Sequence, residues 1–242
     1  MDMNYALVFY THTDYKDVWI PLFHQTNKYY KTQKKYLFVN KQDSILLPEN
    51  WHPIYYDDKQ PYQQRFASCL KQVPEDVVLF HHEDMFLYSV PDYAELDVLA
   101  DIVRNDSLDI VKLLRAEYAN TIPFPTSYHK YVFENPSNLQ FAIQPSICKK
   151  EKLLYIYEQT KGNTIWEFEA LASDVVRKNK IKSCMYYTAS EKKRGMYHWD
   201  SLIYPYFATA VVKGKWNFSD YFATLKPLLI ESKTNISHRG AT

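Results

Sequence analysis

The sequence predicts an α/β domain with a central, mostly parallel sheet flanked by helices. In its first half, short apolar runs of the kind buried on both faces alternate with segments whose apolar residues recur at helical spacing. This alternation is typical of parallel sheets covered by helices. The chain of 242 residues, 46% hydrophobic and 24% charged, has the size and composition of a globular domain with its own core.

The N-terminal half is the more regular, Rossmann-like part. Residues 5–10 form the first apolar run, and the polar cluster 11–14 suits the start of a helix that continues to about Asn27. The run 77–80 is the clearest buried strand. Further strands are expected at 35–40, 52–56 and 109–114, and further helices at 61–72 and 91–104.

The C-terminal half is less regular, and neither a repeat nor a Gly/Ser linker divides the chain. We therefore expect one domain over 1–231, made of a first half (about 1–115) and a second half (about 116–231), followed by a C-terminal tail, 232–242. The elements expected in the second half are a strand within 140–148, a helix over 164–178, a short strand at 184–187, an aromatic loop over 198–206 and an extended segment at 208–216.

Charge, cysteines and hydropathy exclude several classes of protein. A net charge of +1 provides no field to attract nucleic acid. The three cysteines are odd in number and unclustered, which favours reduced thiols and a cytoplasmic location. The longest apolar stretch, 202–212, is about half of a membrane span, and the N-terminus lacks the basic region of a signal peptide. We therefore expect no transmembrane segment.

Glycine and aromatic residues are the two skewed classes. The four glycines form neither G-x-G-x-x-G nor a P-loop, so any phosphate site must use a metal or side chains. Aromatic residues make up 17% of the chain, and aromatic surfaces stack on sugars and bases. An AT-rich coding bias explains the aromatic excess at least equally well.

Two polar clusters follow strands of the predicted sheet, 11–14 after the first strand and 81–84 after the fourth. Ligands of open parallel sheets bind beyond the carboxyl ends of the strands, so these clusters locate the predicted site. If extended geometry continues past the strand, His82 and Asp84 share one face and Glu83 points away. That pair suits a divalent cation completed by waters and a diphosphate, and the imidazole favours Mn²⁺ over Mg²⁺. A solvated acidic turn with a packed His82 is the alternative.

The segment 164–169 contains the second candidate group. Thr164 and Glu167 have the spacing of a capping box, which gives Glu167 a structural reason to be present. Glu169 lies three residues after Trp166, on the same helix face. A carboxylate beside an indole is partly desolvated, which raises its pKa and suits a general base. A surface Glu beside a core Trp is the alternative.

A third group lies further along the chain. His198 would complete a metal site or contact a phosphate oxygen, and Lys213 and Lys215 would neutralise a leaving diphosphate. A simply hydrogen-bonded His198 is the alternative. Neither G-x-S-x-G, CxxC nor H-E-x-x-H occurs, so serine hydrolase, structural zinc and zinc protease classes are disfavoured.

Taken together, these features resemble GT-A-fold glycosyltransferases of the kind that build surface polysaccharides and viral or bacterial glycans. The resemblance covers roughly residues 5–222, and no single motif carries it. The matching segments, in order, are 5–14, Tyr62-Gln-Gln-Arg-Phe-Ala followed by Val77 to Met85, Gln144-Pro-Ser-Ile, Trp166-Glu-Phe-Glu169, and His198-Trp with Gly214-Lys-Trp.

The resemblance implies a metal-dependent, inverting transfer of sugar from a UDP- or GDP-linked donor to a glycan or other hydroxyl acceptor, in the cytoplasm (of the host, for a viral protein). It implies Mn²⁺ or Mg²⁺ bound at a DxD-type motif, whose first acid is replaced here by His82. The residues implied are Asp84, His82, Glu83 and His198 for the metal; Glu169, then Glu167, as base; Thr11, His12, Asp14, Tyr62, Gln63, Arg65, Lys213 and Lys215 for the donor; and Trp166 and Trp199 for the acceptor.

Two other functions fit part of the pattern. A sugar-1-phosphate nucleotidyltransferase also places a metal at strand ends, but it normally needs a glycine-rich triphosphate loop. A non-catalytic carbohydrate-binding protein would use the aromatic residues as stacking surfaces, and it leaves the acids at 83, 84 and 169 unexplained.

Overall fold

The structure is a computed structural model. It describes residues 5–40, 46–115, 121–123, 130–133, 140–162, 164–188, 190–194 and 198–242, and of 121–123, 130–133 and His198 it describes the backbone alone.

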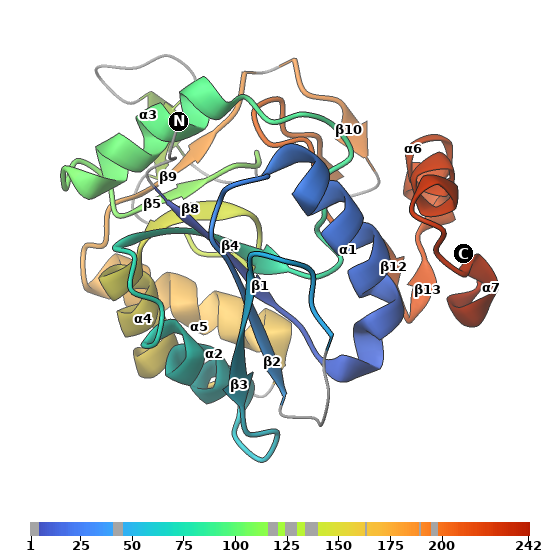
Figure 1. The fold of residues 1–242 in the computed structure, drawn as a ribbon. Coiled ribbons are helices and arrows are strands. Elements are labelled where there is room, and N and C mark those ends of the chain that lie inside the picture. The colour runs from blue at the N-terminus through green and yellow to red at the C-terminus, as the bar shows by residue number, and fades with distance from the viewer. Residues whose placement is uncertain are drawn as a thin grey trace.

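A mixed sheet forms the centre of the described chain (Figure 1). Seven of its nine strands run in one direction, and β7 and β8 run against them. Their order across the sheet is β3 (Trp51–Tyr56), β2 (Lys35–Asn40), β1 (Ala6–Tyr10), β4 (Val77–His82), β8 (Ser146–Lys149), β5 (Ile110–Lys112), β9 (Ser183–Tyr186), β7 (Lys130–Phe133) and β6 (Thr121–Pro123).

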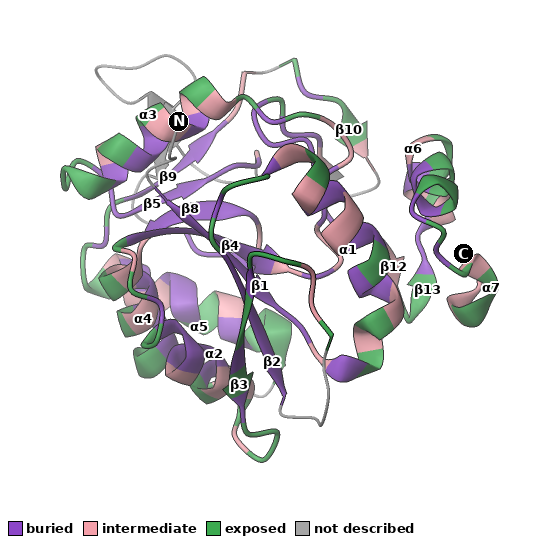
Figure 2. Cartoon of the chain, in the orientation of Figure 1, coloured by how far each residue is buried: buried purple, intermediate pink, exposed green. Residues whose placement is uncertain are grey.

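Strands β1 and β4 lie side by side at the middle of the sheet. All five residues of β1 are buried, as its continuous apolar run predicts (Figure 2). The parallel register pairs Tyr10 with His82, so both strands end at the same level. The polar residues after each strand are thereby brought to one edge of the sheet.

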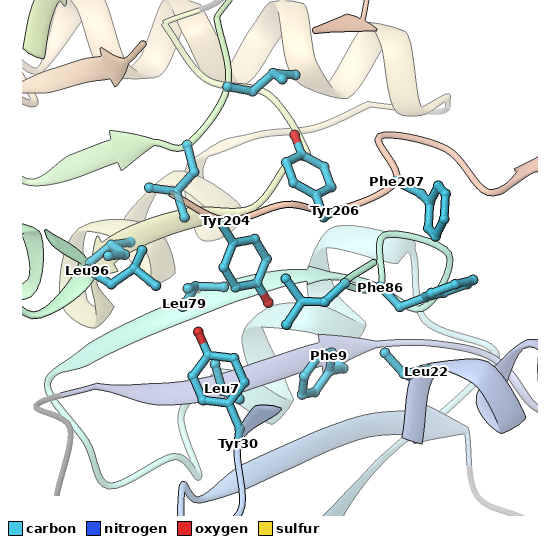
Figure 3. Packing of buried hydrophobic residues seen from close by; sticks show 14 of the residues in the cluster. Leu7, Phe9, Leu22, Tyr30, Leu79, Phe86, Leu96, Tyr204, Tyr206 and Phe207 are labelled. Atoms are coloured by element: carbon cyan, nitrogen blue, oxygen red, sulfur yellow. The ribbon is translucent and has the colours of Figure 1, made fainter. Parts of the chain in front are cut away.

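Helices cover both faces of the sheet. Helices α2 (Tyr62–Leu70), α4 (Lys150–Gln159) and α5 (Ile165–Lys178) cover one face, and α1 (Lys16–Tyr29) and α3 (Tyr93–Arg104) cover the other (Figure 1). Each face has its own hydrophobic cluster. On the α1 face, Tyr30, Tyr204 and Phe207 pack with Leu7 and Phe9 of β1 (Figure 3). Much of the aromatic content therefore serves as core.

Several segments differ from the sequence-based expectation. Helix α4 was not expected, and the strand expected over 140–148 is the short β8. The segment 208–216 is not one extended stretch but a hairpin of β12 (Val211–Val212) and β13 (Lys215–Trp216). Its turn residues Lys213 and Gly214 have φ of 50° and 78°, as a two-residue hairpin turn requires.

The C-terminal residues fold back onto the domain. Helix α6 (Phe218–Glu231) is followed by the short α7 (Ile236–Arg239), and Ala241 forms a bridge with Trp216. Residues 232–242, expected as a tail, therefore contact the domain through the hairpin. No helix in the described part of the chain is long and apolar enough to cross a membrane.

Candidate active site

The site begins at the carboxyl end of β1, where Thr11 is held rigidly. The Tyr56 hydroxyl donates to the Thr11 carbonyl at 2.6 Å, and the Trp19 indole donates to the Thr11 hydroxyl at 2.7 Å. Next, the 3-10 helix η1 (Thr13–Tyr15) starts at His12, whose Nδ1 accepts from the Asp14 amide at 3.1 Å. The polar cluster thus forms a fixed wall beside the end of β4.

The strand β4 ends at His82, and the chain then turns. The Met85 amide donates to the His82 carbonyl at 3.2 Å, which places Glu83 and Asp84 inside the turn. Extended geometry does not continue, so the expectation that His82 and Asp84 share a face was wrong. The structure brings Glu83 and Asp84 together instead.

Glu83 and Asp84 form an acidic pair in which Glu83 is buried and Asp84 is half-buried. The Glu83 residue is 7% exposed, and burial followed by the neighbouring Asp84 raises its pKa. Burial also raises the pKa of Asp84, although hydrogen bonds from the Val211 amide (3.4 Å) and the Thr209 hydroxyl (3.3 Å) oppose that shift. Two desolvated carboxylates in sequence repel each other, and a bound cation would relieve this.

His82 belongs to a separate hydrogen-bonded group on the α2 face. Its Nε2 lies 2.9 Å from the Tyr62 hydroxyl, which lies 3.0 Å from the Tyr157 hydroxyl. Burial, followed by the charge of His81, lowers the pKa of His82 to about 3, so its imidazole is neutral. His82 and Tyr62 therefore hydrogen-bond to each other. This contact fixes the start of α2 beside the end of β4.

Glu169 lies near the start of α5, where the Thr164 hydroxyl caps the helix by accepting from the Glu167 amide at 3.1 Å. The Thr164 half of the predicted capping box is therefore confirmed, and Glu167 itself is exposed. Burial raises the pKa of Glu169, while the Ile143 amide, which donates to its carboxylate at 2.7 Å, and Lys112 oppose the shift. Glu169 keeps one fixed oxygen and a pKa suited to accepting a proton.

A pocket of about 390 Å³ opens beside this carboxylate. Trp166 and Glu169 line it together. Trp166 is 82% exposed, so its indole borders the pocket without packing in the core. The remaining lining residues are Ala170, Leu171, Ser173, Asp174 and Arg177. In this arrangement the indole could hold a sugar ring while the carboxylate accepts a proton from one of its hydroxyls.

Of the other residues predicted to bind the donor, Arg65 and His12 contact the loop before α2, and Gln63 is buried. Arg65 donates to the Gln60 carbonyl at 2.6 Å and to the Asp58 carbonyl, so it organises the loop before α2. His12 Nε2 lies 3.3 Å from the Asp58 carboxylate. Gln63 is buried, and its Oε1 has no hydrogen-bond partner among the described residues.

The C-terminal part of the chain supplies the opposite wall of the site. Lys213 and Lys215 are exposed on the hairpin whose first strand begins with Val211, an Asp84 partner. Trp199 packs beneath the Arg115 guanidinium, 4.5 Å from the ring centre, away from the pocket beside Glu169. His198 lies in β11 (His198–Trp199), opposite Arg194 of β10 (Lys193–Arg194), and its side chain lies outside the described residues.

The described residues offer only a small set of metal ligands. Within the described ranges, no group of three or more His, Cys, Asp or Glu side chains converges to hold a metal ion. The acidic pair at 83 and 84 does fit a cation such as Mg²⁺ or Mn²⁺, which is commonly bound by one or two carboxylates together with substrate phosphates. His82 is directed to Tyr62 and does not belong to that pair.

Four functional candidates, Thr209, Val211, Lys112 and Arg239, were not predicted from the sequence. Thr209 and Val211 hold Asp84, and Lys112, buried at the carboxyl end of β5, opposes the raised pKa of Glu169. Lys112 could have been noticed in the sequence, because a lysine at the end of an apolar strand is rarely buried without a partner. Arg239 of α7, which pairs with Asp17, had no signal, since 222 residues separate the two.

Comparisons with known proteins bear on the fold. No protein-family model and no curated protein matches the sequence. The crystal structure of S. aureus TarS 1–349 is similar at a TM-score of 0.50 and 14% identity, over 98% of this chain and 68% of that one. CMP:2-keto-3-deoxy-manno-octonic acid synthetase complexed with CTP is similar at a TM-score of 0.48 and 12% identity, over 76% of this chain and 89% of that one. The glycosyltransferase GlyE of Streptococcus pneumoniae TIGR4 is similar at a TM-score of 0.44 and 11% identity, over 77% of this chain and 46% of that one.

The TarS likeness extends over nearly the whole chain and shows a common fold. Together with the strand order and the helices on both faces, it confirms the predicted fold class, an α/β domain with a mostly parallel central sheet flanked by helices.

Proposed function

We propose that this protein is a metal-dependent glycosyltransferase that moves a sugar from a nucleoside-diphosphate donor to a hydroxyl acceptor. The observation that carries the proposal is the acidic pair of buried Glu83 and half-buried Asp84 in the turn after β4, on the sheet edge where ligands of such folds bind. The exposed Trp166 and the half-buried Glu169, which share one pocket, support an acceptor side.

The acidic pair would hold the divalent cation, Mn²⁺ or Mg²⁺. When bound, the cation neutralises the diphosphate that departs as the sugar is transferred. Asp84 is the better oriented ligand, because Val211 and Thr209 fix one of its oxygens. The wall formed by Thr11, His12 and Asp14 lies beside the neighbouring strand and would bind the nucleoside part of the donor.

Glu169 would act as the general base. Its carboxylate is anchored at one oxygen by the Ile143 amide, and its raised pKa strengthens it as a proton acceptor. Removing the acceptor hydroxyl proton as the sugar–phosphate bond breaks gives a single displacement with inversion. Trp166 would place the acceptor by stacking on its apolar face.

Nucleotide binding tests this proposal directly. UDP, GDP, dTDP and CMP are each added with and without Mn²⁺ while the thermal unfolding midpoint is measured. A ligand at 100 times its Kd adds about 2.7 kcal/mol to the free energy of unfolding, which raises the midpoint by roughly 5–10 °C for a chain of this size. We expect a Mn²⁺-dependent rise with one diphosphate and no such rise with Asp84→Asn.

Adding a nucleoside triphosphate and glycans to the same measurement separates the alternatives. A nucleotidyltransferase would respond to a nucleoside triphosphate more strongly than to the diphosphate. A carbohydrate-binding protein would respond to glycans and to none of the nucleotides, and that outcome would contradict the proposal.

A further inference from the structure

We infer that Arg239, from the C-terminal helix α7, is a donor-site residue that binds the diphosphate beside the acidic pair. This inference rests on the proposed function for the identity of its ligand. It assigns a binding role to the last residues of the chain, which the sequence marks only as a tail.

The guanidinium of Arg239 is held in a fixed orientation at the start of α1. Its Nε and one terminal nitrogen each donate to the Asp17 carboxylate at 2.7 Å, in the paired geometry that Arg forms with carboxylates. The guanidinium also lies over the Tyr15 ring, 4.7 Å from its centre. Both side chains of the ion pair are nearly buried, at 11% and 12% exposure for Arg239 and Asp17.

This fixed cation adjoins the two walls of the site. One terminal nitrogen lies 3.4 Å from the Asp14 carbonyl, in the loop after β1, and the other lies 3.3 Å from the Gly214 carbonyl, in the hairpin turn. Val211, at the base of that hairpin, donates to Asp84. Figure 1 shows α7 next to β13, in keeping with these contacts.

The guanidinium therefore borders the same edge of the sheet as the acidic pair, because it contacts the η1 segment after β1 and the hairpin whose Val211 holds Asp84. A diphosphate bound at the pair would lie within its field.

The chemistry of the site requires such a cation. Glu83 and Asp84 lie in the turn after β4, and a diphosphate bound there adds further negative charge, of which one divalent cation offsets only part. Lys213 and Lys215 are exposed, so their charges are screened by solvent. Arg239 is nearly buried and already oriented. Its contacts with Asp17, Asp14 and Gly214 use four of its five N–H groups. The fifth, on the nitrogen facing Gly214, has no partner among the described residues and is available to a phosphate oxygen.

Calorimetric titration of the full chain with inorganic pyrophosphate, in the presence of Mn²⁺, tests the inference. The key variant is the double substitution Asp17→Asn with Arg239→Gln, which removes the cation without leaving Asp17 buried and unpaired. It is expected to weaken pyrophosphate binding about 10- to 100-fold, the effect of losing a hydrogen bond to a charged group. Asp17→Asn alone keeps the guanidinium and is expected to weaken binding far less.

Arg239→Lys provides a second variant should the double variant unfold. It keeps the charge and an ion pair with Asp17 but loses the planar fork, so it is expected to weaken pyrophosphate binding about 3- to 10-fold while the unfolding midpoint stays near that of the wild type. Lys226→Gln, which removes an exposed cation of α6, is the matched control and should bind as the wild type does.

The outcomes separate the inference from the proposed function. Unchanged pyrophosphate affinity in both Arg239 variants would overturn the inference and leave the glycosyltransferase proposal standing. Loss of affinity in these variants, with no sugar transfer by the wild type from any donor, would support the inference and contradict the proposed function. A wild type that binds no pyrophosphate would contradict both.

Discussion

The Asp84 carboxylate accepts a hydrogen bond from the Thr209 hydroxyl at 3.3 Å, across 125 residues of sequence. The Asp84 carbonyl also accepts from the Ala210 amide at 3.0 Å, so backbone and side chain are held by one segment. Asp84, in the turn after β4, is thus positioned by the chain that leads into the C-terminal hairpin. The candidate site is therefore built from both halves of the molecule, and changes in either half should affect it.

Substitution of Asp84 should abolish the activity and preserve the fold. Asp84→Asn keeps the shape and removes the charge, so we expect sugar transfer to fall by roughly 100-fold or more, since the metal contributes several kcal/mol to the transition state. Steady-state transfer and circular dichroism give the two readouts. Asp106→Asn, an exposed substitution on a loop, is the control. Near-normal transfer by Asp84→Asn would contradict the role of this acid.

The metal-free protein should lose stability as the pH rises through neutrality. Burial raises the pKa of both Glu83 and Asp84, so the folded protein holds these protons more tightly than the unfolded chain does. Below the ordinary carboxyl range both states hold these protons, so the pair imposes no penalty. The free energy of unfolding falls as the pH rises from that range to the raised pKa values of the folded protein, and it levels off above them. Urea denaturation in a chelator, across pH 4 to 9 in roughly unit steps, measures this fall.

Glu83→Gln should flatten that pH dependence, because it removes one of the two buried charges. Glu167→Gln, an exposed substitution, should leave the dependence as in the wild type. Equal slopes for wild type and Glu83→Gln would show that the acidic pair does not control stability.

Glu169→Gln should separate donor binding from transfer. The amide keeps the volume and can still accept from Ile143, but it cannot take a proton, so transfer should fall about 100- to 10,000-fold. Donor affinity should be unchanged when measured by calorimetry. Glu167→Gln is the matched control two residues away. It should lower only the stability of the start of α5 and leave transfer unchanged. The reverse pattern would assign the base to Glu167.

Trp166→Ala should weaken acceptor binding without destabilising the fold. The indole is 82% exposed and lines the pocket beside Glu169, so its loss removes little core packing. Loss of aromatic stacking costs about 0.5–1.5 kcal/mol, which raises the KM for the acceptor roughly 2- to 10-fold. The KM for the donor should not change. A fall in the unfolding midpoint instead would indicate that Trp166 is a structural residue.

Most of the fold follows from local sequence patterns. The strands β1 and β4 are continuous apolar runs that become buried along nearly their whole length, and the Thr164 hydroxyl marks the start of α5 in sequence and in structure. Helix α4 was not predicted because the residue before it, Lys149, is not one of the Ser, Thr, Asp or Asn residues that cap helix starts, and its side chain makes no capping hydrogen bond.

The site was only partly predictable. Strand-end position identified Asp84 and helix-face position identified Glu169, but the orientation of Glu83 depends on a turn at His82 that a two-residue repeat does not encode. The contacts of Asp84 with Thr209 and of Arg239 with Asp17 arise from chain folding over long separations. No local pattern in one sequence specifies such pairs.

Release of nucleoside diphosphate from UDP- and GDP-sugars, measured with Mn²⁺ and with a chelator, tests the central claim most directly. The account predicts release with one donor class that requires the metal and is lost in Asp84→Asn, while Asp106→Asn retains it. Release that is equally fast in chelator, or equally fast in Asp84→Asn, would contradict a metal-assisted donor site at the end of β4.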